Sequence, residues 1–437
     1  MSPDEKNCPD DTTIRILGPQ KLTSALPYRS WADGKTVKLF IDNESCDDFQ
    51  EAKEMEFEAA GPRQHLYFAP NRVKCAIVTC GGLCPGINDV IRAIVMEAHH
   101  AYGVASILGI PYGLEGFIPR YGHKVIELTP ERVADIHYCG GTMLGSSRGP
   151  QPPEEIVDTL ERANVNILFV IGGDGTMKAA QAISQEVRQR QLRMSVIGIP
   201  KTIDNDINFI QQSFGFETAV FKATEAIQCA HTEARGTPNG IGLVKLMGRE
   251  SGFIAALSTL AMKEVNFVLI PEAPFTLEGE GGLLPALEAR VKARGHAVIV
   301  AAEGAGQHLL QQNSQKDASG NPLLGDVAAL LKGEIKRYFK AGDMPYSIKY
   351  IDPSYIIRAV PANANDKVYC GFLGQHAVHA GMAGRTDMVV AKLQERYVHL
   401  PLELVTRKRR KLNPHSDLWR AVLESTGQGR LAGMQPD

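Results

Sequence analysis

Short runs of consecutive apolar residues alternate with longer amphipathic stretches from about Lys74 onward. We predict strands at CAIVTC (75–80), ASILGI (105–110), NILFVI (166–171), SVIGI (195–199), GLVKLM (242–247), NFVLI (266–270) and AVIVAA (297–302). Helix-like stretches lie between them, such as 88–102 and 177–190. Strands that are buried on both faces have continuous apolar sequences, so this alternation predicts an α/β fold with mainly parallel sheets covered on both sides.

The chain outside this alternation is more polar. Residues 1–70 have scattered Pro and Gly and weak periodicity, so we expect an extension that wraps or caps the fold. The Gly-, Asn- and Ser-containing stretch 306–326 is expected to be an exposed loop. A boundary between two α/β lobes is predicted near 210–240, and the chain is expected to cross back after about residue 360.

The bulk properties exclude several classes of protein. The chain has 437 residues with a formal net charge of −2, which does not favour a nucleic-acid partner. One basic run, 407–411, is expected to be a solvated surface stretch. No apolar run reaches the ~18 residues of a membrane span, and the polar N-terminus lacks the pattern of a secretory signal. We therefore expect a cytosolic protein without a membrane or nucleic-acid partner.

The chain has 8 cysteines, none of them in a Cys-x-x-Cys pair. Several lie in strand-like runs, which favours buried thiols over disulfides or a zinc site. The cysteines are at positions 8, 46, 75, 80, 84, 139, 229 and 370.

Three expected strand-to-helix junctions are rich in glycine, at 79–88, 140–149 and 171–176. Glycine allows a phosphate to approach the peptide N–H groups, and a helix N-terminus adds partial positive charge. In the third junction Asp174 stands between Gly173 and Gly175. A carboxylate beside a phosphate needs a bridging cation, so Asp174 is a candidate Mg²⁺ contact, direct or through water. The alternative is that it caps the following helix.

A dense polar set follows the strand expected at 195–199, in Pro200-Lys201-Thr202-Ile203-Asp204-Asn205-Asp206. Phosphoryl transfer to an alcohol needs a group that accepts the hydroxyl proton, and Asp204 can be that base. Asp206 can help to hold the metal shell or the loop, while Thr202 and Lys201 can contact phosphate oxygens. A turn made of helix-capping residues is the alternative.

Several cations could bind phosphates. Arg148 follows a glycine-rich turn and Arg249 a strand end, and arginine forks onto phosphate oxygens. Lys349, Tyr355 and Arg358 lie in KYIDPSYIIR and could form a second anion site. Each taken singly is more often part of a surface ion pair. Neither a Walker A motif nor G-x-G-x-x-G is present, which weakens the P-loop and dinucleotide-dehydrogenase interpretations.

Taken in order, these motifs resemble the phosphofructokinase family from about Lys74 to Tyr397. The matching segments are GGLCPGIN, GGTMLGSSRG, GGDGT, PKTIDND, LMGRESGF, AAEGAG and KYIDPSYIIR. The pair PKTIDND and GGDGT is highly specific, whereas lipid and NAD kinases share only a GGDGT turn. The resemblance implies transfer of the γ-phosphate of ATP to the 1-hydroxyl of fructose 6-phosphate, a step of glycolysis, with Mg²⁺ as cofactor.

The resemblance also implies roles for individual residues. The catalytic group would be Asp204, the base, with Thr202, Lys201 and Arg148. The donor would be bound by Gly82, Arg148, Gly173, Asp174, Gly175 and Thr176, with Asp174 serving the metal. The sugar phosphate would be bound by Thr202, Asp204, Asp206, Met247, Gly248, Arg249, Glu303, Lys349, Tyr355 and Arg358.

The fold implied by the family is two similar Rossmann-like lobes with the active site in the cleft between them, assembled as a homodimer or homotetramer. On this basis we divide the chain into an N-terminal extension (1–70), a donor lobe (71–235 plus part of the C-terminal region), a sugar-phosphate lobe (236–360) and C-terminal crossing helices with a tail (361–437).

The chain departs from the allosteric bacterial form of the family at several positions. Gly240 stands where that form has an arginine that reaches into the neighbouring subunit, and Lys201 replaces a glycine. Lys349 and Tyr355 stand where that form has Arg and His. These features resemble the branch with plant and kinetoplastid ATP enzymes and many pyrophosphate-dependent ones.

We expect ATP to be the donor. Gly175 leaves the path of the α-phosphate, ribose and adenine open, whereas pyrophosphate users typically carry an aspartate there; Lys201 alone favours pyrophosphate. The alternatives are a pyrophosphate-dependent phosphofructokinase, a lipid or nucleotide kinase that shares only the GGDGT turn, and an inactive regulatory subunit. The last would be expected to lack Asp204 or Asp174, and both are present.

Overall fold

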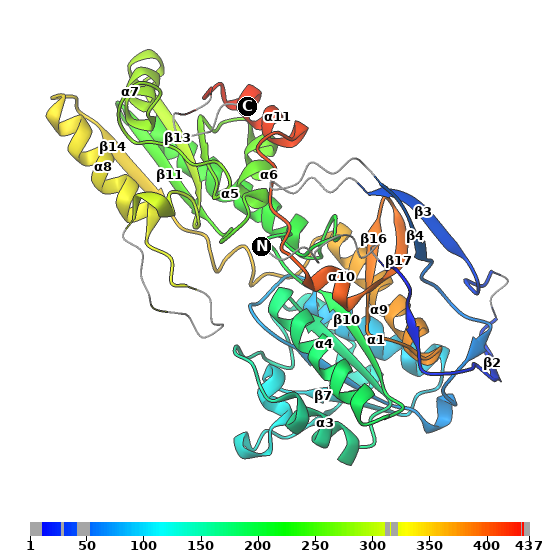
Figure 1. Cartoon of the computed structure of the whole chain (residues 1–437). Coiled ribbons are helices and arrows are strands. Elements are labelled where there is room, and N and C mark those ends of the chain that lie inside the picture. The colour runs from blue at the N-terminus through cyan, green and yellow to red at the C-terminus, as the bar shows by residue number, and fades with distance from the viewer. Residues whose placement is uncertain are drawn as a thin grey trace, which may run out of the picture.

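Two α/β lobes, each built around its own sheet, make up most of the protein (Figure 1). The structure is a computed structural model, and it describes residues 11–27, 30–41, 53–310, 315, 322–429 and 431. Both sheets consist mainly of parallel strands with helices on both faces, as the pattern of apolar runs predicts. All seven predicted strands are present, within one or two residues of the expected positions.

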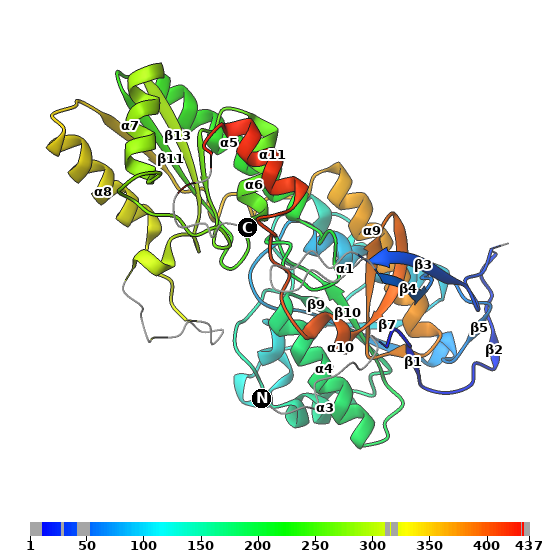
Figure 2. The same ribbon diagram turned by 45° about the horizontal axis from the view of Figure 1, so that its top comes forward.

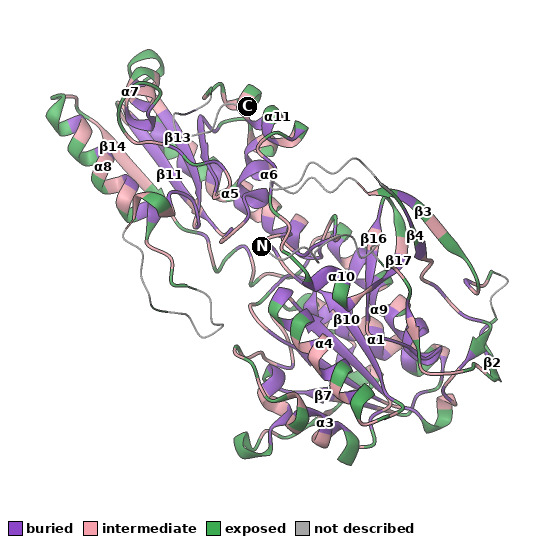
Figure 3. Cartoon of the chain, viewed as in Figure 1, coloured by how far each residue is buried: buried purple, intermediate pink, exposed green. Residues whose placement is uncertain are grey.

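The larger lobe contains a seven-stranded sheet in the order β17-β16-β10-β9-β6-β7-β8. Its strands are β6 (Lys74–Thr79), β7 (Ser106–Ile110), β8 (Ile126–Glu127), β9 (Ile167–Gly172), β10 (Ser195–Pro200), β16 (Met388–Leu393) and β17 (Arg396–Pro401). Only the edge strands β8 and β17 pair antiparallel. Every residue of β9 and β10 is buried, which explains their uninterrupted apolar sequences (Figure 3).

Alternate side chains of the central strand β9 enter two different cores. Ile167, Phe169 and Ile171 belong to one hydrophobic cluster, and Leu168 and Val170 belong to another. The first cluster includes α1 (Ile87–Met96) and α9 (Ala364–Met382), which pack on each other. The second includes α3 (Pro153–Arg162), α4 (Asp174–Gln189) and α10 (Leu402–Thr406). The sheet is thus covered on both sides.

The smaller lobe has a four-stranded parallel sheet in the order β12-β13-β11-β14. Its strands are β11 (Gly240–Leu246), β12 (Phe267–Leu269), β13 (His296–Ala302) and β14 (Ser347–Ile351). The helices α5 (Phe216–Arg235) and α6 (Phe253–Met262) pack on this sheet, and α7 (Leu283–Arg294) and α8 (Val327–Ala341) share a separate core with it. In Figure 2, α11 (Asp417–Thr426) lies across α6.

The packing of α5 puts the lobe boundary within the expected range 210–240, but earlier than the division at residue 235. This helix contacts β11, β13 and β14, so it belongs with the smaller lobe, and the chain leaves the larger lobe before Phe216. It returns at α9, whose first turn is tied to α5 because Asp366 accepts hydrogen bonds from the backbone of Gly215 and Thr218. The stretch 407–416 then leads to α11 on the smaller lobe.

The N-terminal extension packs on the C-terminal part of the larger lobe. β1 (Arg15–Ile16) pairs with β15 (Arg385–Thr386), β2 (Leu22–Thr23) pairs with β5 (His65–Leu66), and the hairpin of β3 (Thr36–Ile41) and β4 (Lys53–Glu58) lies beside β17. Glu58 anchors it through contacts with His399 Nδ1 at 2.7 Å and Arg385 Nε at 3.2 Å. Burial raises the pKa of Glu58, but His399, Arg385 and Arg63 outweigh it and lower the pKa overall.

The remaining elements are short. They are α2 (Pro130–Val133), the 3₁₀ helices Pro70–Arg72, Gly113–Phe117, Pro119–Tyr121, Ile136–Tyr138 and Gln307–Leu309, and a π-helical turn Glu97–Ala101 that continues α1. Within the loop predicted at 306–326, residues 311–314 and 316–321 lie outside the described residues. None of the helices in the described part of the chain has the length and apolar character needed to cross a membrane.

The cysteines of the described residues are all free thiols. Cys75, Cys80, Cys84 and Cys370 are buried, as predicted, while Cys139 and Cys229 are exposed. Positions 8 and 46 lie outside the described residues.

Candidate active site

A cavity of about 710 Å³ lies where the two lobes meet. Its floor follows the carboxyl ends of β6, β9 and β10, where ligands bind in open α/β sheets. The opposite wall comes from the ends of β11 and β13 and from the segment after β14. The predicted site residues that line it are Gly82, Arg148, Gly173, Asp174, Gly175, Thr176, Lys201, Thr202, Asp204, Asp206, Met247, Arg249, Glu303 and Arg358.

The turn between β9 and α4 presents a helix N-terminus to this cavity. A Cβ at Gly172 would lie 2.3 Å from Thr176 Oγ1, so only glycine fits where the strand meets the helix. Gly173 is the N-cap residue of α4, and no side chain caps this end. The alternative that Asp174 caps the helix is therefore wrong. At Gly175 a Cβ would meet nothing within 4 Å, so the space beside the helix N-terminus is open.

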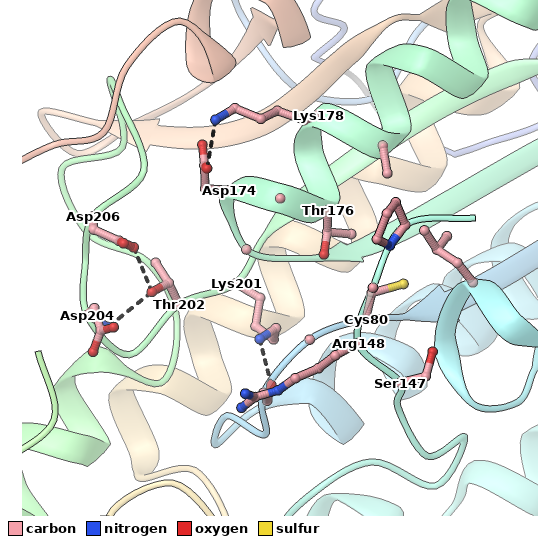
Figure 4. A pocket seen from close by; sticks show the side chains of 18 of the residues that line it. Cys80, Ser147, Arg148, Asp174, Thr176, Lys178, Lys201, Thr202, Asp204 and Asp206 are labelled. Atoms are coloured by element: carbon pink, nitrogen blue, oxygen red, sulfur yellow. Dashed lines mark hydrogen bonds and ion pairs between the residues drawn. The ribbon is translucent and has the colours of Figure 1, made fainter. Parts of the chain in front are cut away.

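The carboxylate of Asp174 is paired with two cations. Its side chain is buried, and Oδ2 accepts from Lys178 Nζ at 3.0 Å (Figure 4). Arg409 Nε donates to the same oxygen at 3.3 Å. The environment of Asp174 therefore accommodates positive charge, which is the property expected of a metal contact. The described residues contain no group of three or more His, Cys, Asp or Glu side chains that could hold a metal ion. An ion here would complete its shell with phosphate oxygens and water, as Mg²⁺ commonly does.

The loop after β10 carries the predicted base. Thr202 Oγ1 donates to Asp206 Oδ1 at 2.9 Å and accepts from the backbone N–H of Asp204 at 3.1 Å (Figure 4). Oδ1 of Asp204 is buried, and it has no hydrogen-bond partner among the described residues. Burial, followed by the charges of Asp206 and Glu303, raises the pKa of Asp204 to about 8. A carboxyl group with these properties is typical of an acid–base site.

Three cations gather around Gly82. Lys201 Nζ donates to the Gly82 carbonyl oxygen at 2.7 Å, and burial lowers the pKa of this ammonium group. A Cβ at Gly82 would lie 3.4 Å from Arg358 Nη1 and 3.8 Å from Arg148 Nη2. Arg358, from the segment after β14, thus lies beside Arg148 of the larger lobe. This arrangement can bind phosphate groups that approach from either lobe.

Three of the predicted sugar-phosphate residues do not line the cavity. Lys349 on β14 forms an ion pair with Glu233 at 3.7 Å, and Tyr355 is 74% exposed. Gly248 is also outside the lining; its φ of 134° and a Cβ position 2.5 Å from the Ser251 carbonyl oxygen explain the glycine. The structure of the single chain therefore groups Arg358 with Met247, Arg249 and Glu303 but leaves Lys349 and Tyr355 apart.

Lys178, Arg409 and an apolar wall of the cavity were not predicted. Lys178 follows Asp174 by one helical turn, a spacing that the sequence could have revealed. The wall comprises Leu114, Ile156, Ala179, Ala182 and Ile183. Arg409 corrects our interpretation of the basic run 407–411 as a solvated surface stretch, because its side chain lines the cavity and pairs with Asp174. No local pattern could have placed this residue 235 positions from its partner.

Gly240, the departure noted at the start of β11, is required by the local packing. A Cβ there would lie 2.0 Å from the carbonyl oxygen of Ala234, at the end of α5. The arginine of the allosteric bacterial form has no room on this backbone.

A buried carboxyl group beside a glycine-rich helix N-terminus, facing cations across a cleft between two α/β lobes, is the arrangement of a phosphotransferase that acts on an alcohol. Residues 74–381 match the sequence profile of the family described as Phosphofructokinase, and the chain belongs to this family. The predicted resemblance is thereby confirmed.

Similar curated proteins extend this result. The chain is 52% identical over 378 residues to "ATP-dependent 6-phosphofructokinase" of Borreliella burgdorferi, covering 85% of each chain. It is 49% identical to "ATP-dependent 6-phosphofructokinase 7" of Arabidopsis thaliana over 87% of this chain and 78% of the plant protein. A solved pyrophosphate-dependent phosphofructokinase from Marinobacter aquaeolei superposes with a TM-score of 0.66 at 21% identity, covering 84% of this chain and 94% of that one. At that identity the match concerns the fold.

Proposed function

We infer that this chain is an ATP-dependent 6-phosphofructokinase, which transfers the γ-phosphate of ATP to the 1-hydroxyl of fructose 6-phosphate. The observation that carries this inference is the position of Asp204. Its carboxyl group lies in the same cavity as the N-terminal turn of α4 and the cations Arg148 and Arg358. The names of relatives that are about half identical over most of the chain support the same reaction.

Asp204 is the proposed base that accepts the proton of the sugar hydroxyl. Phosphoryl transfer depends mainly on positioning and on stabilisation of the charge on the transferring group. Arg148 and the N-terminus of α4 would stabilise that charge on the donor side. Met247, Arg249, Glu303 and Arg358 would hold the sugar phosphate.

Mg²⁺ is the proposed cofactor, and Asp174 would hold it. When bound, the ion would neutralise the negative charge of the donor phosphates. Asp206 would support this arrangement through its hydrogen bond with Thr202.

The apolar wall of the cavity favours ATP over pyrophosphate. Ile156 of α3 and Ala179 and Ile183 of α4 line the same cavity as Gly175, where the space is open. Pyrophosphate has no apolar part to bury, whereas the adenine of ATP does. Lys201, which pyrophosphate users also carry, is compatible with either donor.

We also propose that the protein is a homodimer or homotetramer. Tyr355 and Ile356 are exposed on the smaller lobe, and Lys349 lies outside the cavity of one chain. A subunit contact that completes the 6-phosphate site would explain their position. Sedimentation of the purified protein would test this, and a monomer at all concentrations would contradict it.

The function is tested by measuring fructose 1,6-bisphosphate formation with ATP or pyrophosphate at equal Mg²⁺. We expect product with ATP, little with pyrophosphate, and a kcat at least ~10²-fold lower for Asp204→Asn, the scale of general-base loss. A preference for pyrophosphate would contradict the donor assignment. A near-normal kcat for Asp204→Asn would remove this residue from the mechanism.

A further inference from the structure

The basic run 407–411 connects α10 and α11 and passes beside the active site, where Arg409 lines the cavity. It is held there by its backbone. Arg409 forms an antiparallel bridge with Ile207, and the N–H of Arg410 donates to the carbonyl oxygen of Asp206 at 2.9 Å. The N–H of Leu412 donates to Glu272 Oε1 at 2.8 Å. The segment is therefore attached directly to the loop that carries Asp204 and Asp206.

The side chain of Arg409 joins carboxylates from the two lobes. Its Nε donates to Asp174 Oδ2 at 3.3 Å, and its Nη1 donates to Glu250 Oε1 at 2.8 Å. Asp174 begins α4 of the larger lobe, and Glu250 follows β11 of the smaller lobe. The Arg409 side chain is about three-quarters buried, and it forms part of the wall beside Gly175 and Thr176. Its guanidinium group is thus next to the helix N-terminus at which we place the donor phosphates.

The charges of the cavity suit a polyanion. Six Lys and Arg residues line it against four Asp and Glu residues. Arg409 shares Asp174 with Lys178, so that one carboxylate is engaged by two cations in the free protein. Arg409 can therefore turn toward a phosphate while Lys178 continues to neutralise the carboxylate of Asp174. Arginine forks onto phosphate oxygens with charge-assisted hydrogen bonds.

We propose that Arg409 is a binding residue for the terminal phosphates of the nucleotide donor. It comes from a segment beyond residues 74–381, the part of the chain that matches the family profile. In the free protein its guanidinium group pairs with Asp174 and Glu250, and in the complex it binds the phosphate oxygens beside α4. This inference rests on the proposed function, because it takes ATP as the donor.

The test measures binding of ATP in the presence of Mg²⁺ by isothermal titration calorimetry, without sugar. Arg409→Gln should raise the Kd for ATP by about tenfold or more, the loss expected for a charge-assisted hydrogen bond. Arg409→Lys keeps the positive charge but cannot form two parallel hydrogen bonds to a phosphate, so its Kd for ATP should lie between those of Arg409→Gln and the wild type. Arg407→Gln is the matched control, because Arg407 pairs with Glu403 at 3.4 Å and does not line the cavity. Its Kd should equal that of the wild type.

Kinetics separate a binding role from a structural one. Arg409→Gln should raise the KM for ATP by about the same factor as the Kd, while the KM for fructose 6-phosphate changes less than about threefold. An unchanged Kd for ATP would overturn the proposal. Equal increases in both KM values would also overturn it, because they would indicate that Arg409 only holds the lobes together. If wild-type protein binds ATP but forms no fructose 1,6-bisphosphate, the proposed function fails while the binding test stands.

Discussion

Thr202 donates its hydroxyl hydrogen to Asp206 Oδ1 over 2.9 Å, while the backbone N–H of Asp204 donates to the Thr202 oxygen. The Thr202 hydroxyl group thus donates a hydrogen bond to the carboxyl group of Asp206 and not to that of Asp204. This hydrogen bond lowers the pKa of Asp206, although burial raises it overall. At Asp204 burial and the neighbouring carboxylates act together, and its pKa rises to about 8.

The first prediction concerns the pH dependence of catalysis. A base must be deprotonated to accept a proton, so a raised pKa keeps Asp204 protonated and inactive below about pH 8. We expect kcat/KM for fructose 6-phosphate at low ATP to increase with pH, to reach half of its plateau near pH 8 and to level off only above that pH. Asp206→Asn removes a charge that raises this pKa, so the rising limb should move to lower pH even where the rate falls. A wild-type profile that is flat from pH 6 to 9 would contradict the assignment.

The second prediction concerns the sugar phosphate. Arg358→Ala should chiefly raise the KM for fructose 6-phosphate, because it removes a charge-assisted contact worth roughly 1.5–3 kcal/mol, or about 10- to 150-fold. Since Arg358 Nη1 also lies close to Gly82, the KM for ATP should be measured in parallel. A rise in the KM for ATP with an unchanged KM for the sugar would place Arg358 on the donor instead.

The third prediction concerns the donor. A side chain at residue 175 would project into open space, since a Cβ there meets nothing within 4 Å. Gly175→Asp should therefore fold normally and place a negative charge beside the α-phosphate of ATP. Charge repulsion is stronger in a desolvated cleft than in bulk water, so ATP use should fall far more than any residual pyrophosphate use. Gly175→Ala is the control for size without charge. If both variants keep wild-type kinetics with ATP, the open space at residue 175 does not determine which donor the enzyme uses.

The fourth prediction concerns the anchor of the C-terminal crossing segment. Glu272 Oε1 accepts from the N–H groups of Gly252 and Leu412, while Oε2 is buried and has no partner in the described part of the chain. Burial raises the pKa of Glu272 to about 7, above its ordinary value of 4.5. Unfolding therefore releases a proton between about pH 4.5 and 7, and the stability of the protein falls as the pH rises through this range.

Glu272→Gln keeps the Oε1 acceptor but cannot become charged. At pH 8 this variant should unfold at a higher temperature than the wild type, by the few degrees that about 1–3 kcal/mol produces. At pH 5 the difference should be much smaller, because the wild-type carboxyl group is then protonated in the folded protein and only partly ionised in the unfolded chain. Thermal unfolding followed by circular dichroism at both pH values measures this, and an equal difference at pH 5 and pH 8 would refute it.

The strands, and the polar residues at their ends, could be predicted from local sequence pattern alone. Strands such as β9 and β10 are buried on both faces, and their uninterrupted apolar sequences made them recognisable without a structure. The turns that follow them place Asp174 and Asp204 at strand ends, and parallel strands bring those ends to one edge of the sheet. Local pattern was sufficient here because each residue's position follows from the strand immediately before it.

The distant segments that complete the site could be identified only from the packing of the folded chain. Lys349 and Tyr355 share a motif with Arg358, yet Arg358 alone of the three lines the cavity. Arg409 belongs to a basic run that resembles ordinary solvated surface, and it reaches Asp174 because the chain crosses back between the lobes. Such contacts depend on how α10 and α11 pack against separate lobes. Packing between segments far apart in the chain leaves no periodic signal in the sequence.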